Sequence, residues 1–187
     1  MRRFFSLAVL AVVSGLMSGC AARNYQTALF DAEGSQAYTL ASGDRLRVLV
    51  FGQDALSNSY SVDGSGHISM PLIGIVQANG QTTHGLETAI ELKLRNGFLR
   101  DPKVSVEVEA YRPFFVLGEV TAAGQFPFIN GMTVQNAVAV AGGFSPRAAQ
   151  SGADLTRIID GRAITGHVSM NQPVRPGDTI TIRERFF

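Results

Sequence analysis

The feature that most constrains this chain is its only cysteine, Cys20, which directly follows an apolar N-terminal segment. Arg2 and Arg3 give that segment a positive start, residues 4–16 are mostly apolar, and small residues precede the cysteine. This order is typical of a secretory signal peptide. Because there is no second cysteine, the exported body cannot form an internal disulfide, and its hydrophobic cores must stabilise it.

The run Leu16-Met17-Ser18-Gly19-Cys20 resembles the lipobox of bacterial lipoproteins. The resemblance implies that residues 1–19 are removed, that Cys20 is the lipidation site, and that the mature protein is anchored by acyl chains, each worth ~0.8 kcal/mol per buried methylene. The residue after the cysteine is Ala21 and not Asp. In lipoproteins of the Gram-negative type, this is compatible with sorting to the outer membrane, where the protein would face the periplasm. The alternatives are an ordinary signal peptide or a transmembrane helix, although a span requires ~20 apolar residues.

The composition argues against nucleic acid as a partner. Removing residues 1–19 takes away two of the 16 basic residues and none of the 15 acidic ones, so the mature chain has a formal charge of −1. A nucleic-acid-binding domain is typically strongly basic, with clustered Lys and Arg.

The residue types that carry most enzyme chemistry do not occur in suitable patterns. His67, His84 and His167 lie far apart, without acidic or cysteine neighbours at metal-ligand spacing. There is no Gly-x-Ser-x-Gly motif, and no glycine-rich stretch leads into the lysine that a phosphate loop uses. The sequence therefore predicts no metal, no cofactor and no enzymatic activity.

The mature chain divides into a tether and two small units. Residues 20–37 show no clear period and are expected to be the tether, followed by a unit over 38–112 with strands and one helix. The elements expected there are a strand over 46–50, a hairpin of 60–62 with 67–70, a strand over 71–76, a helix over 83–96 and a strand over 104–108.

Pro113 marks the joint to the second unit, 113–187, because proline disfavours helical geometry in the residue before it. The elements expected in this unit are a buried strand over 114–117, a short helix over 134–141 that begins after Thr133, a hairpin of 154–159 with 162–164, and a strand over 179–183.

Two short segments with a similar sequence precede strands of alternating pattern. They are Ser42-Gly43-Asp44 and Pro176-Gly177-Asp178. A carboxylate in either segment could act as an acid or base, as could Asp63 beside Gly64. Glycine and aspartate are, however, typical of turns, where glycine supplies an unusual backbone angle and aspartate accepts from turn amides. We interpret all three aspartates as turn residues.

Ordered motifs run through both units. The first unit carries Tyr38-x-Leu40-x-x-Gly43-Asp44-x-Leu46-x-Val48, Val62-Asp63-x-x-Gly66-x-Ile68-x-x-Pro71-x-Ile73-Gly74 and Asp101-Pro102-x-Val104-x-Val106, and the second carries Val116-Leu117-Gly118-Glu119-Val120, Gly124, Thr133-Val134, Ala137, Ala141-Gly142-Gly143 and Pro176-Gly177-Asp178. In this order they resemble a polysaccharide biosynthesis/export domain followed by one soluble-ligand-binding β-grasp (SLBB) domain. The resemblance implies an α+β fold, with an export-type mixed sheet and one helix, then a ubiquitin-like β-grasp unit.

The resemblance also implies a function. Outer-membrane polysaccharide export lipoproteins are non-enzymatic, form homo-oligomeric rings, carry capsule or exopolysaccharide out of the periplasm, and work with inner-membrane co-polymerase and synthesis machinery. Long members end in an amphipathic pore helix, whereas this sequence ends at Phe187 after its last strand, so it resembles the short members, for which a separate outer-membrane barrel is a further partner. The alternative is a monomeric glycan-binding or adaptor lipoprotein that bridges to such a barrel.

Phenylalanines are the candidate contact residues. Phe126 and Phe128 belong to a cluster in the second unit, and aromatic faces can bind sugar, although a small core also needs bulky side chains. Phe186 and Phe187 end the chain and could dock on a neighbouring subunit or lie in a frayed tail. These four residues are the predicted glycan or subunit contacts.

Overall fold

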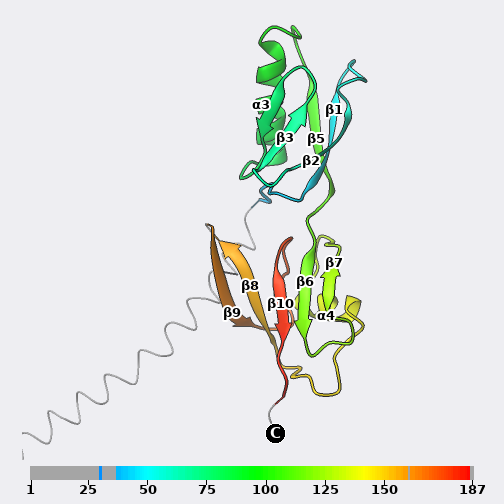
Figure 1. The fold of residues 1–187 in the computed structure, drawn as a ribbon, viewed down its shortest axis with the longest axis vertical. Coiled ribbons are helices and arrows are strands. Elements are labelled where there is room, and N and C mark those ends of the chain that lie inside the picture. The colour runs from blue at the N-terminus through cyan, green and yellow to red at the C-terminus, as the bar shows by residue number, and fades with distance from the viewer. Residues whose placement is uncertain (1–29, 31–36, 160, 186–187) are drawn as a thin grey trace, which may run out of the picture.

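The computed structural model describes residues 30, 37–159 and 161–185. The described chain forms two units that follow one another along the long axis and are joined between β5 (Val104–Ala110) and β6 (Phe114–Gly118) (Figure 1). Each unit has its own buried apolar cluster, one built from residues between Leu40 and Val108 and the other from Phe30 and residues between Phe114 and Ile182. The predicted α+β class is confirmed.

The first unit is built on a three-stranded antiparallel sheet with strand order β2-β1-β5. In the central strand, Leu46, Val48 and Val50 alternate with exposed residues and point into the core, as their period of two predicts. The remaining strands form a separate antiparallel pair. The elements are β1 (Arg45–Val50), β2 (Asn58–Ser61), β3 (His67–Met70), β4 (Gly74–Gln77), α3 (Thr83–Arg95) and β5 (Val104–Ala110).

Helix α3 packs along the outer edge of this sheet. Thr82 caps its start by accepting from the amide of Gly85 at 3.1 Å, and Leu86, Ile90 and Leu94 form its buried stripe. Glu87 accepts from the amide of Val106 at 2.9 Å, and Glu91 accepts from the amide of Val104 at 3.1 Å. The helix therefore satisfies donors on the open edge of β5, which would otherwise be available for pairing with another strand.

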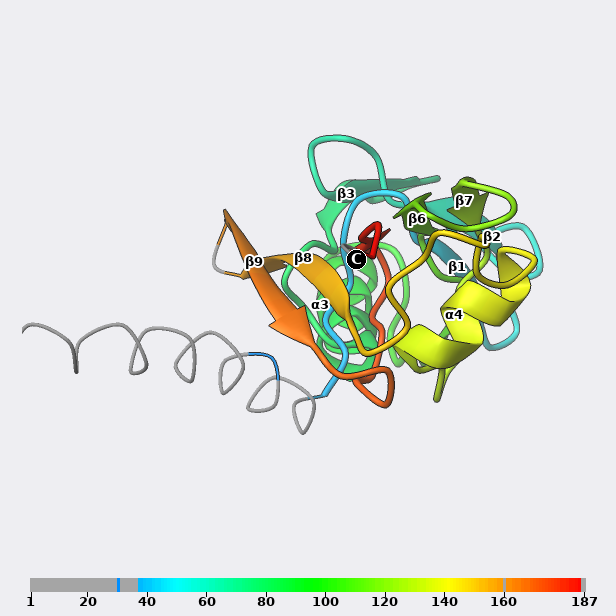
Figure 2. The ribbon, with the colours of Figure 1, turned by 90° about the horizontal axis from the view of Figure 1, so that it is seen from below.

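The second unit has a five-stranded sheet with order β7-β6-β10-β8-β9 and one helix, which is the β-grasp arrangement expected from the sequence. The terminal strand β10 lies in the middle, parallel to β6 and antiparallel to β8. Helix α4 lies against one face of the sheet, behind β6 and β7 in Figure 1 and to one side of them in Figure 2. The elements are β6 (Phe114–Gly118), β7 (Gly124–Phe126), α4 (Val134–Val140), β8 (Ala153–Ile159), β9 (Arg162–Val168) and β10 (Thr179–Ile182).

Several expectations differ from the structure. The strand expected over 71–76 is shorter, because residues 71–73 form a turn and β4 begins at Gly74, and β7 is not among the expected strands. The segments 60–62 and 67–70 do not form a hairpin ladder, because β2 pairs with β1 whereas β3 pairs with β4. A mixed sheet is expected in the first unit, but the strand pairs there are all antiparallel. The parallel pair, β6 with β10, lies in the second unit. The strand over 114–117 is not wholly buried: Phe115 and Leu117 are exposed, because the core covers only one face of the sheet.

Candidate functional site

The two Gly-Asp segments form the same turn. In each, the aspartate amide donates to the carbonyl three residues earlier at 3.1 Å, and the aspartate carboxylate accepts from the amide of that earlier residue. Each central glycine has a positive φ, 94° at Gly43 and 85° at Gly177. The glycine amides donate to Val62 and Pro113, which lie beside the turns. The turn interpretation of Asp44 and Asp178 therefore agrees with the structure.

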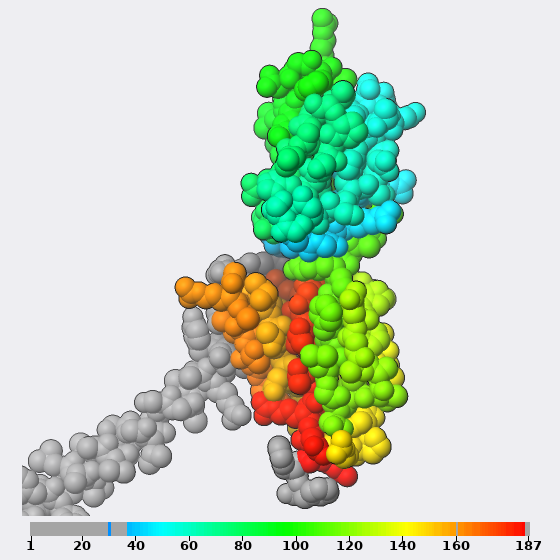
Figure 3. All heavy atoms as spheres, viewed as in Figure 1, coloured from blue at the N-terminus to red at the C-terminus, as the bar shows by residue number. Residues whose placement is uncertain are grey.

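Arg112, which lies between the two units, contacts both turns. Its amide donates to Asp44 at 2.9 Å, and its guanidinium lies 3.7 Å from the same carboxylate. On the other side, a Cβ added to Gly177 would lie 2.7 Å from Nε of Arg112. The two lobes meet at this narrow waist, where the blue and green residues adjoin in Figure 3. Arg112 is therefore packed between the two turns, in contact with one turn from each unit.

Asp44 is fully buried and also accepts from the hydroxyl of Tyr38 at 2.5 Å. Burial, reinforced by this hydrogen bond, raises the pKa of the Tyr38 phenol. The ring of Tyr38 packs edge-on against Tyr111 at 5.0 Å, and Tyr111 packs in the same way against Phe128 at 5.4 Å. The junction therefore combines a row of packed aromatic rings with a buried, hydrogen-bonded carboxylate.

Asp178 forms an ion pair inside the second unit. Arg157 donates from Nε at 2.9 Å and from Nη2 at 2.7 Å to the two carboxylate oxygens. The side chains are only 5% and 1% exposed, and Nη2 of Arg157 also donates to the carbonyl of Pro173. Bidentate geometry of this kind compensates for the desolvation of both charges.

A cavity of about 310 Å³ opens at the junction between the units. Its walls include the three arginines Arg112, Arg157 and Arg175 and one carboxylate, Asp178. Polar residues of the first unit complete it: Tyr38, Thr39, Ser42 and Asn79.

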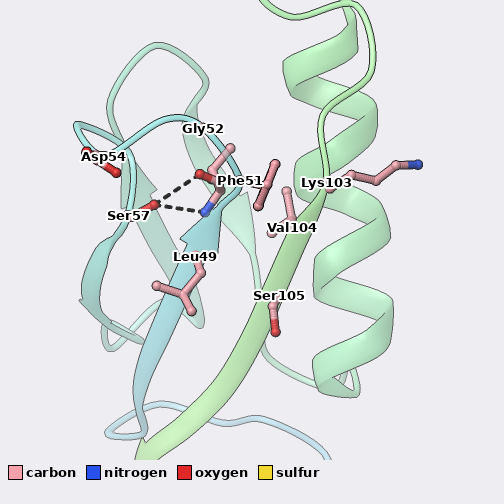
Figure 4. A pocket seen from close by; sticks show the side chains of 9 residues that line it. Leu49, Phe51, Gly52, Asp54, Ser57, Lys103, Val104 and Ser105 are labelled. Atoms are coloured by element: carbon pink, nitrogen blue, oxygen red, sulfur yellow. Dashed lines mark hydrogen bonds between the residues drawn. The ribbon is translucent and has the colours of Figure 1, made fainter.

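A larger, mainly apolar pocket of about 760 Å³ lies at the far end of the first unit, and we call it the apical pocket (Figure 4). Phe51 is 88% exposed and lies beside Val104 there, with Lys103, Asp54 and Ser105 adding polar groups. Ser57 fixes the loop over residues 51–57, which follows β1. Its hydroxyl accepts from the amide of Val50 at 2.9 Å and lies 3.2 Å from the carbonyl of Val50. Leu49, which lines the same pocket, is also exposed, so two large apolar side chains are presented together.

Comparison with protein families places both units. The profile described as polysaccharide biosynthesis/export protein matches residues 32–109, and the SLBB domain profile matches residues 113–169. The chain therefore carries a polysaccharide biosynthesis/export domain followed by an SLBB domain. The first unit is therefore its export domain, and the second is its single SLBB domain.

A curated relative supports the assignment. The chain is 36% identical over 132 residues to the exopolysaccharide production protein ExoF of Rhizobium meliloti (strain 1021). The match covers 64% of this chain but 31% of ExoF, so the chain spans about a third of that relative's length.

The predicted contact residues are placed as follows. Phe126 is half-buried on the SLBB core, with its ring 6.0 Å from that of Phe114, and Phe128 is half-buried against Tyr111 at the junction. Both therefore pack within the protein on one side and retain some exposed surface. Cys20, Phe186 and Phe187 lie outside the described residues.

The histidines and Asp63 take local roles. Asp63 accepts from the hydroxyl of Ser65 and the amide of His67, and these hydrogen bonds lower its pKa. His84 pairs with Glu87, and His167 pairs with Asp154. In the described ranges, no group of three or more His, Cys, Asp or Glu residues could hold a metal ion. None of the helices in that part of the chain has the length and apolar character needed to cross a membrane.

Sequence reasoning missed three residues that the structure makes prominent: Phe30, Arg112 and Phe51. Phe30 lies in the predicted tether but is buried in the SLBB core. Arg112 is the residue before Pro113, and Phe51 directly follows the strand expected over 46–50, so neither position carries a functional motif. A signal existed for Phe51, because it extends the apolar end of β1 into a Gly-containing turn.

Proposed function

We propose that this protein is a periplasm-facing lipoprotein of the outer membrane, anchored through Cys20, and a non-enzymatic component of capsule or exopolysaccharide export. The proposal rests on one combined observation: an export domain and an SLBB domain, in that order, follow a signal-peptide-like segment that ends in the chain's only cysteine. The name of the relative ExoF, an exopolysaccharide production protein, supports the same class of polymer.

The mechanism is geometric. Copies of the chain assemble into a homo-oligomeric ring whose lumen passes a hydrated glycan, and polar groups offer it weak, replaceable hydrogen bonds. The apical pocket supports such an assembly, because two large apolar side chains, Leu49 and Phe51, are exposed together there and could be covered by a neighbouring copy. The energy for export comes from inner-membrane co-polymerase and synthesis machinery, and a separate outer-membrane barrel completes the path.

The decisive experiment replaces Cys20 with serine in the full-length precursor. We expect the variant to be lost from the membrane fraction and polysaccharide secretion to fall, because the acyl anchor cannot form. Ser18→Ala, which keeps a small residue before the cysteine, is the matched control and should remain anchored. Unchanged membrane association and secretion in Cys20→Ser would contradict the lipoprotein role.

The oligomeric state needs its own measurement. Crosslinking in membranes and native mass measurement of the detergent-extracted lipoprotein should show a defined oligomer. Only monomers under both conditions would contradict the ring, and saturable oligosaccharide binding by such a monomer would favour a glycan-binding adaptor.

A further inference from the structure

Phe30 is a fixed point inside the segment expected to be a loose tether. Its side chain is fully buried, and it belongs to the same apolar cluster as Phe114, Leu155 and Ile180 of the SLBB domain. A phenylalanine ring that is removed completely from water contributes strongly to the stability of the core that encloses it. The SLBB core is therefore built partly from a residue that precedes the export domain in the sequence.

The guanidinium of Arg157 lies over the Phe30 ring. The guanidinium carbon lies 5.5 Å from the ring centroid, within the range of a cation–π contact. The guanidinium cannot move freely, because it is held by both oxygens of Asp178 and donates to the carbonyl of Pro173. The ring thus lies beneath a cation whose position is set by the turn at Pro176-Gly177-Asp178.

We propose that the SLBB domain binds the N-terminal tether through Phe30, and that this contact sets the length of free chain between the lipid anchor and the folded body. The proposal rests on the proposed lipidation of Cys20. It assigns the surface formed by Arg157 and the SLBB core as a docking site whose occupant is this chain's own Phe30.

The consequence is a shorter free tether between the lipid anchor and the first fixed residue. Phe30 is ten residues from Cys20, and ten extended residues reach at most about 35 Å. Without this contact, the first fixed residues would lie near Tyr38 at the junction, and the free chain would reach about 60 Å. Docking of Phe30 therefore holds the SLBB domain close to the membrane and makes the SLBB domain, rather than the export domain, the part that carries the anchor.

The first test measures the contact itself in the full mature chain by hydrogen exchange. Phe30→Ala should raise exchange in the β8 and β10 peptides at least tenfold, whereas Phe30→Leu, which keeps an apolar side chain, should raise it less than threefold. Phe51→Ala removes an exposed phenylalanine of the export domain and is the matched control, with no change expected in either strand. Unchanged exchange in Phe30→Ala would overturn the proposal.

The second test measures the reach of the free tether in the lipidated protein on vesicles. Acylation blocks the sulfur of Cys20, so Ile158→Cys, at an exposed position next to Arg157, supplies the reactive thiol for a fluorescent donor. Energy transfer to headgroup-labelled lipid should be high in this background, fall by at least half on adding Phe30→Ala, and be retained with Phe30→Leu. Equal transfer with and without Phe30→Ala would overturn the claim that docking of Phe30 shortens the free tether.

The two tests separate the proposal from the proposed function. If Cys20 is not lipidated, the labelled protein fails to bind the vesicles and Cys20 remains reactive, which contradicts the lipoprotein role. The exchange measurement does not require the anchor, so it still decides whether Phe30 docks in the SLBB domain.

Discussion

The turn at Ala41–Asp44 in the export domain and the turn at Arg175–Asp178 in the SLBB domain have the same backbone but different surroundings. Both place a glycine at positive φ and a carboxylate that accepts from the turn's first amide. Asp178 then pairs with the buried Arg157 inside its own domain, whereas Asp44 pairs with Arg112, whose side chain is 29% exposed. One local motif therefore stabilises a domain core in one place and a domain joint in the other.

The difference shows that a turn motif defines a local shape but not its role. In the SLBB domain the carboxylate neutralises a charge that is almost completely buried. In the export domain it receives the amide of Arg112 and the hydroxyl of Tyr38, at the point where the chain passes into the next domain. Removing the two aspartates should therefore have unequal effects.

The largest effect is expected from Asp178→Ala. It leaves the buried guanidinium of Arg157 without its carboxylate, and breaking a buried ion pair costs about 3–5 kcal/mol. Asp44→Ala leaves amide and hydroxyl donors unsatisfied beside a partly exposed arginine, so a smaller loss of about 1–3 kcal/mol is expected. Denaturant unfolding measures both losses.

Hydrogen exchange assigns these losses to a domain: β10 should be affected by Asp178→Ala and β1 by Asp44→Ala. Asp101→Ala is the control, because its pair with Lys103 is exposed and contributes little. Equal losses from the two variants would show that the two turns have the same role.

The next effect concerns the glycines of the two turns. Alanine at a positive φ costs about 1–2 kcal/mol, and at Gly177 it must also displace Arg112. Gly177→Ala should therefore be more destabilising than Gly80→Ala, where φ is 80° and no atom lies within 4 Å of the added Cβ.

Arg112 provides the check on that prediction. Adding Arg112→Ala should remove the excess cost of Gly177→Ala and leave the cost of Gly80→Ala unchanged. If Gly177→Ala and Gly80→Ala are equally destabilising by thermal unfolding, Arg112 is not wedged against the SLBB turn.

A smaller effect compares the helix caps of the two domains. Thr82 caps α3, and Thr133 caps α4 in a capping box with Asn136. Replacing either threonine with alanine should cost about 1 kcal/mol, because an N-terminal amide loses its acceptor. Thr88→Ala, inside α3, is the control, and a cap variant as stable as this control would contradict the cap's contribution.

The smallest effect is a pH dependence in the SLBB domain. Partial burial raises the pKa of Asp154, but hydrogen bonds from Arg183 and His167 lower it by more, so the pKa lies below its ordinary value. A carboxyl with a lowered folded-state pKa adds stability above its unfolded-state pKa of about 3.9, and this stability is lost as the pH falls through the folded-state pKa. Asp154→Asn should cost less than about 1 kcal/mol at pH 7 and progressively less as the pH falls toward about 2.

Unfolding of wild type and Asp154→Asn at both pH values provides the measurement. Glu109→Gln in the export domain is the parallel variant, because hydrogen bonding by Ser59 and the charge of Arg45 lower the pKa of Glu109 in the same direction. A constant difference between wild type and Asp154→Asn at all pH values would contradict the ionic origin of the effect.

Much of the local structure could be predicted from the sequence. Leu46, Val48 and Val50 gave the central strand by their period of two, Thr133 marked the start of α4, and both Gly-Asp turns were recognised. These features depend on interactions between residues close in sequence, so their pattern is visible in the chain itself. The lipidation of Cys20 and the contacts of Phe186 and Phe187 stay predictions.

The sequence by itself therefore determined the class of the fold, the order of most of its elements and the turns in front of β1 and β10. Only the tertiary structure decided that β2 and β3 join different sheets, that Phe115 faces outward, and that Phe30 packs into a domain more than eighty residues further along the chain. The physical reason is that periodicity reports which residues share a face, whereas burial depends on which distant segment covers that face.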